Sequence, residues 1–314
     1  MMGAHLKETF MIIDYPYLNP PVFQLGPIAP RWYAMMYIIG FVFAYLIISK
    51  HSRFKGRGFT NDDVMDYLTY AFVGVLAGGR LGYVLFYGLS KYLANPLEIL
   101  YIWQGGMSFH GGLLGVIAAT ALYAYRKKIP LREMFDITAL ASPIGLFFGR
   151  LGNFITGELW GGPTDGTWGV RFKETYNQVT QTYEYGPPRH PSQLYEAVLE
   201  GLLLFVILYA FTRLTYTQRK LKPGSVAGMF LLGYGCARFA VEFVRVPDSH
   251  INYLFGTGWM TMGHLLSTPM IGIGLLMILV FNMMGEKAPE LTGEEARALQ
   301  KKAPDVTPET DTTA

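Results

Sequence analysis

Apolar residues occur along this chain in blocks of about twenty, the length at which a helix crosses the hydrocarbon core of a bilayer. The chain of 314 residues is 51% hydrophobic and 16% charged, whereas soluble domains carry about 25% charged residues. Together these features predict an all-α polytopic membrane protein. Its single cysteine, Cys236, excludes an internal disulfide.

The apolar blocks predict seven membrane-spanning helices. We expect them at residues 32–50, 63–87, 107–126, 133–150, 192–212, 226–246 and 262–284.

The remaining residues divide the chain around this seven-helix domain of residues 32–284. We expect residues 1–31 to be an external segment at the membrane interface. Residues 88–104 form an interfacial arm, and the polar stretch 151–191 forms a small external head between the fourth and fifth helices. Residues 285–314 form a charged tail, partly disordered because it is rich in Thr, Pro and Glu.

Lysine and arginine are distributed unevenly between the two sets of connecting segments. Sixteen of the 26 lie within residues 50–57, 126–132, 213–222 and 287–302. Because basic residues accumulate on the cytoplasmic side of a membrane protein, we expect these segments inside. The N-terminus and the head then lie outside, and the C-terminus lies inside.

Two arginines, Arg150 and Arg238, fall inside predicted helices, near their outer ends, and we expect Arg150 to close the fourth helix. A charged side chain in hydrocarbon costs about 2.5–3.5 kcal/mol, so such residues usually mark an ion path, a proton relay or a bound anion. The planar guanidinium group suits phosphate. The sequence therefore predicts a lipid-accessible anion site that opens to the outer side.

Other polar residues are expected at a similar depth. The spacing of Tyr234, Arg238, Glu242 and Arg245 places them on one helical face, where Glu242 can pair with either arginine or both. Structural alternatives stay open for several candidates: a snorkelling role for Arg245, a strut bonded to carbonyl groups for Arg80, an aromatic-belt position for Tyr33, and a helix cap rather than a base for His110.

Several kinds of site have no support in the sequence. The six histidines are scattered without the paired spacing of a metal centre. No glycine-rich loop follows a strand, and no nucleic-acid-binding element is evident. We therefore predict no metal, no cofactor and no nucleic-acid partner.

Four motifs resemble, in order and spacing, those of the prolipoprotein diacylglyceryl transferase family. They are SFHGG at residues 108–112, GRLGNFITGELWG at 149–161, HPSQLYE at 190–196, and the glycine–tyrosine–glycine, arginine, glutamate and arginine pattern from Gly233 to Asp248. The resemblance covers about residues 20–285. One departure is Thr156, where the family signature usually has Asn, and this leaves the role of that position open.

The resemblance implies an enzyme that moves the sn-1,2-diacylglyceryl group of phosphatidylglycerol onto the lipobox cysteine of a prolipoprotein, the first step of lipoprotein maturation. The product is a thioether, and glycerol 1-phosphate leaves. It also implies a bacterial inner-membrane protein, expected to be monomeric, whose active site faces the periplasm and whose partners are the lipid bilayer, phosphatidylglycerol and prolipoprotein signal peptides.

The resemblance also suggests roles for individual residues. Arg150 and Arg238 would hold the phosphate, and His110 is the first candidate for the base that takes the thiol proton, with Tyr234 second. The remaining residues expected to bind substrate or to orient these groups are Tyr33, Asn153, Glu158, Gly161, Glu242 and Arg245.

Intramembrane arginines alone would also allow a transporter or flippase of an anionic lipid. That alternative predicts an inverted repeat and broken helices at the bilayer midplane. The sequence shows no internal repeat, and its charges cluster towards one side. A third alternative, a noncatalytic scaffold, predicts that Arg150 and Arg238 tolerate lysine or glutamine.

Overall fold

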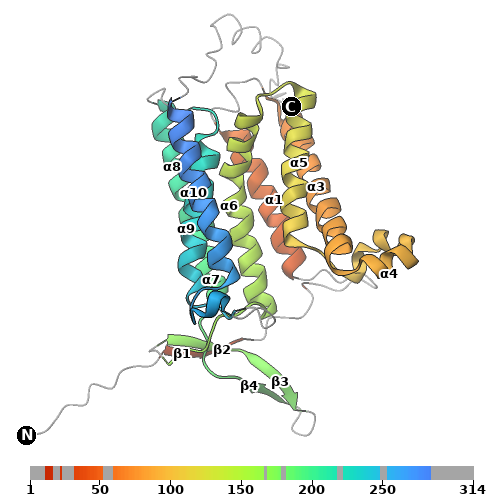
Figure 1. The fold of residues 1–314 in the computed structure, drawn as a ribbon, viewed down its shortest axis with the longest axis vertical. Helices are drawn as coiled ribbons and strands as arrows, with labels where there is room; N and C mark the ends of the chain where they lie inside the picture. Colours follow the sequence, from red (N-terminus) through yellow and green to blue (C-terminus); the bar gives the residue numbers. More distant parts are fainter. Residues whose placement is uncertain are drawn as a thin grey trace, which may run out of the picture. The chain divides into compact units, whose positions relative to one another are not determined.

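A computed structural model describes residues 11–16, 22, 32–51, 59–165, 168–177, 182–217, 222–247 and 253–283, which are mostly helical (Figure 1). The chain divides into two compact units. The first comprises Met1–Ala44, Thr138–Arg219 and Gly224–Gly285, and the second comprises Tyr45–Ile137, Lys220–Pro223 and Glu286–Ala314.

Each of the seven segments predicted to span the membrane is helical. The helices are α1 (Trp32–Lys50), α3 (Asn61–Tyr87), α5 (Phe109–Lys127), α6 (Leu131–Thr156), the run formed by α7 (Ser192–Glu196), the π-helical η3 (Ala197–Leu203) and α8 (Leu204–Thr217), then α9 (Ser225–Glu242) and α10 (Met262–Met283).

Five of these helical segments are long and apolar enough to cross a membrane: Trp32–Lys50, Asn61–Tyr87, Leu131–Thr156, Ser192–Leu214 and Met262–Phe281. This establishes the membrane character of the protein. The other two, α5 and α9, have 19 and 18 residues; α5 carries Arg126 and Lys127 in its last turn, and α9 contains Arg238 and Glu242.

Three predicted helix ends were wrong. The fifth helix runs to Thr217 rather than to residue 212. Helix α6 runs six residues past Arg150, to Thr156, and ends where Gly157 adopts a φ of 70°. The N–H of Gly157 donates to the carbonyl of Phe154 (3.0 Å) and the N–H of Glu158 to that of Asn153 (2.9 Å), which is a Schellman motif. Helix α9 ends at Glu242 rather than at residue 246, so Arg245 lies in the turn that follows.

In the second unit, α3 and α5 pack closely along their glycines. A Cβ atom on Gly78 would lie 2.7 Å from the Cα of Gly115, and one on Gly82 would lie 2.7 Å from the Cα of Gly111. Only glycine permits this approach, and small residues at four-residue spacing are typical of closely packed membrane helices. At the other end of the pair, the Tyr123 hydroxyl donates to the carbonyl of Asp63 (2.7 Å).

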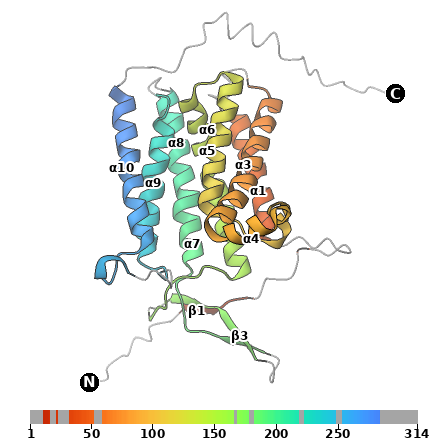
Figure 2. The same cartoon turned by 45° about the vertical axis from the view of Figure 1, so that its right-hand side comes forward.

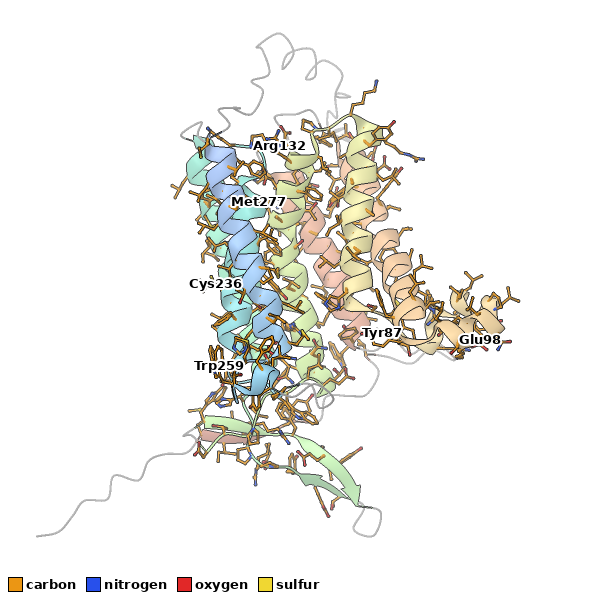
Figure 3. The ribbon with its side chains drawn as sticks, viewed as in Figure 1. Tyr87, Glu98, Arg132, Cys236, Trp259 and Met277 are labelled. Carbon is orange, nitrogen blue, oxygen red and sulfur yellow. The ribbon has the colours of Figure 1, made fainter. Side chains whose placement is uncertain are left out.

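An arm follows α3 and consists of α4 (Leu89–Ala94), η1 (Pro96–Leu100) and η2 (Ile102–Gln104). Arg80, only 3% exposed, holds the arm by donating to the carbonyls of Glu98 (2.6 Å), Ile99 (2.8 Å) and Gly105 (2.5 Å), so it is the strut that the sequence allowed. A hydrogen bond to the Glu98 carboxylate raises the pKa of Lys91. Figure 3 shows Glu98 on the arm, beyond Tyr87 at the end of α3.

In the first unit, α9 and α10 run side by side, as the views of Figures 1 and 2 agree. Glycines again allow the approach, since a Cβ on Gly274 would lie 2.5 Å from the backbone nitrogen of Leu232. In the sequence, the short η4 (Leu254–Gly256) lies between α9 and α10. Trp259 follows η4 and lies near the start of α10 (Figure 3).

Short strands in the first unit form two small sheets. Strand β1 (Met11–Asp14) pairs in parallel with β2 (Trp168–Arg171), and β3 (Lys173–Asn177) pairs antiparallel with β4 (Thr182–Tyr185). The sequence analysis did not foresee that the N-terminal segment would supply a strand to the head. Buried Tyr15 secures it by donating to the carbonyl of Ile155 (2.5 Å), near the end of α6.

Candidate functional site

Three arginines and three glutamates meet within the first unit. Arg150 comes from α6, Arg238 from α9 and Arg245 from the turn after α9. Glu196 ends α7, Glu200 lies in the π-helical η3, and Glu242 ends α9. We call these six residues the charge cluster.

Glu196 is the centre of the charge cluster. Its Oε2 lies 2.9 Å from Nε of Arg150, and its Oε1 accepts from Nη1 of Arg238 (2.5 Å) and from Nη1 of Arg245 (2.6 Å). The Glu196 side chain has no exposed surface. One buried carboxylate therefore fixes three guanidinium groups that come from separate parts of the chain.

Glu200 and Glu242 form additional ion pairs with the same arginines. Glu200 is also fully buried and lies 3.6 Å from Nη2 of Arg150 and 3.8 Å from Nη1 of Arg238. Glu242 lies 2.9 Å from Nη2 of Arg238 and 3.4 Å from Nε of Arg245. The predicted pairing of Glu242 with both arginines is confirmed.

Burial separates the two kinds of side chain in the charge cluster. The carboxylate side chains are 0%, 0% and 6% exposed, whereas those of Arg150, Arg238 and Arg245 are 19%, 18% and 17% exposed. The arginine side chains are therefore the more accessible members of the charge cluster. An approaching anion would meet the arginines and not the glutamates.

Gly161 brings the Arg245 segment to the charge cluster. The N–H of Gly161 donates to the carbonyl of His190 (2.9 Å), and the N–H of Gly162 donates to that of Val244 (2.8 Å). A Cβ on Gly161 would lie 2.6 Å from the Val244 oxygen and 2.7 Å from the His190 oxygen. The structure therefore requires glycine at this position for close backbone packing. This requirement is separate from the substrate-binding role that the sequence predicts for Gly161.

Four other predicted site residues also belong to the first unit. Tyr33 of α1 packs on Gly152, where a Cβ would lie 3.0 Å from the tyrosine ring, and Asn153 is buried near the end of α6. Glu158 has an exposed side chain, while its carbonyl accepts from buried Gln193 (2.7 Å). Tyr234 lies one helical turn before Arg238 and stacks on Phe230.

His110 belongs to the second unit. It is the second residue of α5, whose N-cap is Ser108, and its exposed ring makes an edge contact with Phe109.

Thr156, the residue that departs from the family signature, donates its hydroxyl to the carbonyl of Gly152 (3.0 Å) at the end of α6. At this position the side chain therefore satisfies a carbonyl of its own helix.

The sequence analysis missed Glu196 and Glu200, although the sequence contained a signal for both. They stand four residues apart in an otherwise apolar block, and carboxylates inside a membrane span are as unusual as arginines. Among the carboxylates within the predicted helices, only Glu242 was given a role. In the part of the chain that the structure describes, no group of three or more His, Cys, Asp or Glu side chains is arranged to hold a metal ion.

Comparisons with known proteins identify the family. The model of the prolipoprotein diacylglyceryl transferase family matches residues 20–280. The chain belongs to this family. A relative from Oleidesulfovibrio alaskensis, named phosphatidylglycerol–prolipoprotein diacylglyceryl transferase, is 50% identical over 285 residues, which cover 90% of this chain and all of the relative.

Two further relatives of the same name confirm family membership over most of the chain. The protein from Mesorhizobium japonicum is 44% identical, with 91% of this chain and all of the relative covered. That from Solidesulfovibrio magneticus is 47% identical, with 84% and 95% covered. The family match includes all six residues of the charge cluster.

We predict that Glu196→Gln destabilises this transferase-family protein strongly. The variant leaves three clustered guanidinium groups with two carboxylates, and removing one partner of a buried ion pair costs about 3–5 kcal/mol. Thermal unfolding in detergent should show a large drop in the midpoint. Glu98→Gln, which breaks the exposed pair with Lys91, is the matched control and should have little effect. Equal midpoints for the two variants would contradict a central role for Glu196.

Proposed function

We propose that this chain transfers the diacylglyceryl group of phosphatidylglycerol to a cysteine thiol of a prolipoprotein. The observation that carries the proposal is the partly exposed face of three arginines held by buried carboxylates. Guanidinium groups fixed in this way suit a phosphodiester. The names of the relatives supply the lipid and the acceptor protein.

The reaction forms one bond and breaks another. The thiol sulfur attacks the glycerol carbon that carries the phosphate, and the carbon–oxygen bond to that phosphate breaks. The thioether product keeps the diacylglyceryl group, while glycerol 1-phosphate leaves with the bonding electron pair. The thiol proton passes to a base. Negative charge therefore grows on the phosphate, where fixed cations lower the barrier.

Some arginine N–H groups of the charge cluster take no part in its ion pairs and can donate to that phosphate. Among the described residues, the ion pairs with glutamate use Nε and Nη2 of Arg150, Nη1 and Nη2 of Arg238, and Nη1 and Nε of Arg245. They do not use Nη1 of Arg150, Nε of Arg238 or Nη2 of Arg245. We propose that these N–H groups bind the phosphate oxygens, while the carboxylates keep the guanidinium planes in place.

The remaining substrate contacts follow from the motifs. We propose that Asn153 and Glu158 orient the glycerol head group or the arginines, that Tyr33 and Gly161 line its pocket, and that Glu242 and Arg245 support Arg238. His110 or Tyr234 accepts the thiol proton. Three glutamates pair with the three arginines, so the positive charge of Arg238 near Tyr234 is largely compensated.

We further propose a bacterial inner-membrane topology of seven spans, with the head and N-terminus in the periplasm and the C-terminus in the cytoplasm. The distribution of lysine and arginine supports this orientation. The acceptor is then a lipobox cysteine next to a signal helix. The chain acts as a monomer, because one chain supplies all six members of the charge cluster.

Arg150→Gln and Arg238→Gln should each lower transfer by about 100-fold or more, because each removes a fixed donor from the departing phosphate. Arg150→Lys should not restore activity, since an ammonium group cannot bridge two carboxylates and a phosphate. The assay uses purified protein, phosphatidylglycerol liposomes and a lipobox peptide, and mass spectrometry follows the gain of a diacylglyceryl group.

The control variant is Arg171→Gln, which removes an exposed arginine paired with Asp14 (2.7 Å) outside the charge cluster and should leave transfer unchanged. A peptide with serine in place of cysteine should gain no mass. Absence of product with folded wild-type protein would overturn the transferase proposal, and the same liposomes would then be tested for lipid movement.

The two candidate bases make different predictions for the pH profile. If His110 accepts the proton, His110→Gln should lower the rate about 100-fold or more near pH 7, and Tyr234→Phe much less. The deficit should shrink as the pH rises past about 8.5, where the substrate thiol ionises by itself. The reverse pattern would assign the proton to Tyr234. Two unaffected variants would exclude both residues.

The topology is tested with single cysteines in a Cys236→Ala background. A membrane-impermeant maleimide should label Glu184→Cys, in the exposed strand β4, on intact spheroplasts. It should label Arg126→Cys, at the exposed end of α5, only after the membrane is broken. Opposite labelling of the two positions would reverse the proposed orientation.

A further inference from the structure

A second set of contacts holds Glu242 from the side opposite the arginines. The hydroxyl of Thr261, just before α10, donates to Oε1 of Glu242 (2.7 Å), while Oε2 of the same carboxylate faces Arg238 and Arg245. Thr261 is 4% exposed and Glu242 is 6% exposed. Both oxygens are thus engaged in different directions, and this fixes the rotation of the carboxylate.

His264 fixes Thr261 in turn. The backbone N–H of Thr261 donates to Nδ1 of His264 (3.2 Å), so Nδ1 carries no proton and the neutral ring has its hydrogen on Nε2. The hydroxyl of Thr261 also lies 3.1 Å from Nδ1. Because an ionised carboxylate only accepts, the hydroxyl proton belongs to the bond with Glu242.

Aromatic rings hold the His264 side chain itself. The ring is 1% exposed, and its centroid lies 4.6 Å from that of Phe243, 4.7 Å from that of Phe239 and 5.4 Å from that of Trp259. All three contacts are edge-on. Trp259 lies beside the start of α10, as Figure 3 shows. The imidazole is therefore packed in one orientation, with Nδ1 facing the backbone of Thr261.

Gly263 provides an independent sign that α10 is fitted to Glu242. A Cβ added to Gly263 would overlap the carboxyl group of Glu242, reaching Oε2 at 2.5 Å and the other carboxyl atoms more closely. The first turn of α10 therefore approaches this carboxylate without an intervening side chain. A helix N-terminus so placed also favours the negative charge of Glu242.

We propose that Thr261 and His264 are positioning residues that act through Glu242 on Arg238 and Arg245. They set the carboxylate, and the carboxylate sets the two guanidinium groups that receive the phosphate. The inference rests on the proposed function, since it assigns these residues to the same phosphate site. Neither residue belongs to the four motifs by which the sequence resembles its family.

The test compares Thr261→Val with Thr261→Ser. Valine keeps the shape of threonine but lacks the hydroxyl, whereas serine keeps the hydroxyl. Thr261→Val should lower kcat/KM for phosphatidylglycerol about 10-fold to 100-fold, the range for a lost hydrogen bond to a charged group, and Thr261→Ser should stay close to wild type. Rates are compared at equal amounts of folded protein.

A double-mutant cycle asks whether the effect passes through Glu242. In a Glu242→Gln background, Thr261→Val should change the remaining rate by no more than about 2-fold, because the interaction is already lost. An undiminished effect in that background would overturn the inference, as would wild-type rates for Thr261→Val. An inactive wild-type protein would instead overturn the proposed function together with this inference.

A second measurement does not depend on turnover. Phenylglyoxal modifies accessible guanidinium groups, and peptide mapping separates Arg238 and Arg245 from Arg171. Thr261→Val and His264→Leu should both speed modification of Arg238 and Arg245 while leaving Arg171, which is outside the charge cluster, unchanged. Unchanged reactivity of Arg238 and Arg245 in both variants would show that Thr261 and His264 do not position them.

Discussion

A carboxylate without solvent contact is stable only when cations and hydrogen bonds surround it, and Glu196 imposes this requirement on the whole site. It is fully buried and contacts Arg150, Arg238 and Arg245 at 2.5–2.9 Å. Helix α6, helix α9 and the turn after α9 must therefore converge on the end of α7. The backbone contacts of Gly161 with His190 and Val244 then fix the last of these segments.

The same ion pairs determine how the arginines can act. Because three glutamates pair with three arginines, the charge cluster, in the role we propose for it, would offer an arriving phosphodiester oriented N–H groups and little net charge. Such donors need no rearrangement when charge develops on the leaving phosphate, and this preorganisation is the main electrostatic contribution to catalysis in many enzymes. Lysine cannot take over this role, since its ammonium group lacks the planar array of donors that serves a carboxylate and a phosphate at once.

Periodicity and charge predicted the helical segments and the meeting of Arg238, Glu242 and Arg245, because these depend on local spacing. The predicted end of α6 at Arg150 was wrong, because the helix continues to Thr156, and Gly157, which is visible in the sequence, closes the Schellman motif. The pairing of β1 with β2 joins residues more than 150 positions apart, and no local pattern encodes such a register. The arginines that Glu196 binds come from other elements, so local spacing does not predict these pairs, although the place of Glu196 in an apolar block is visible in the sequence.

The family motifs can be understood through the contacts they make. GRLGNFITGELWG supplies Arg150, the helix-ending Gly157 and the closely packed Gly161, whereas HPSQLYE supplies Glu196 together with Gln193, which binds the carbonyl of Glu158. Each of these two motifs thus combines a charged member of the cluster with the backbone contacts that place it. Thr261 and His264 extend the same logic beyond the motifs, because a guanidinium group is only as well oriented as the carboxylate that holds it. In the proposed site, the orientation of the phosphate would then depend on residues that never touch it.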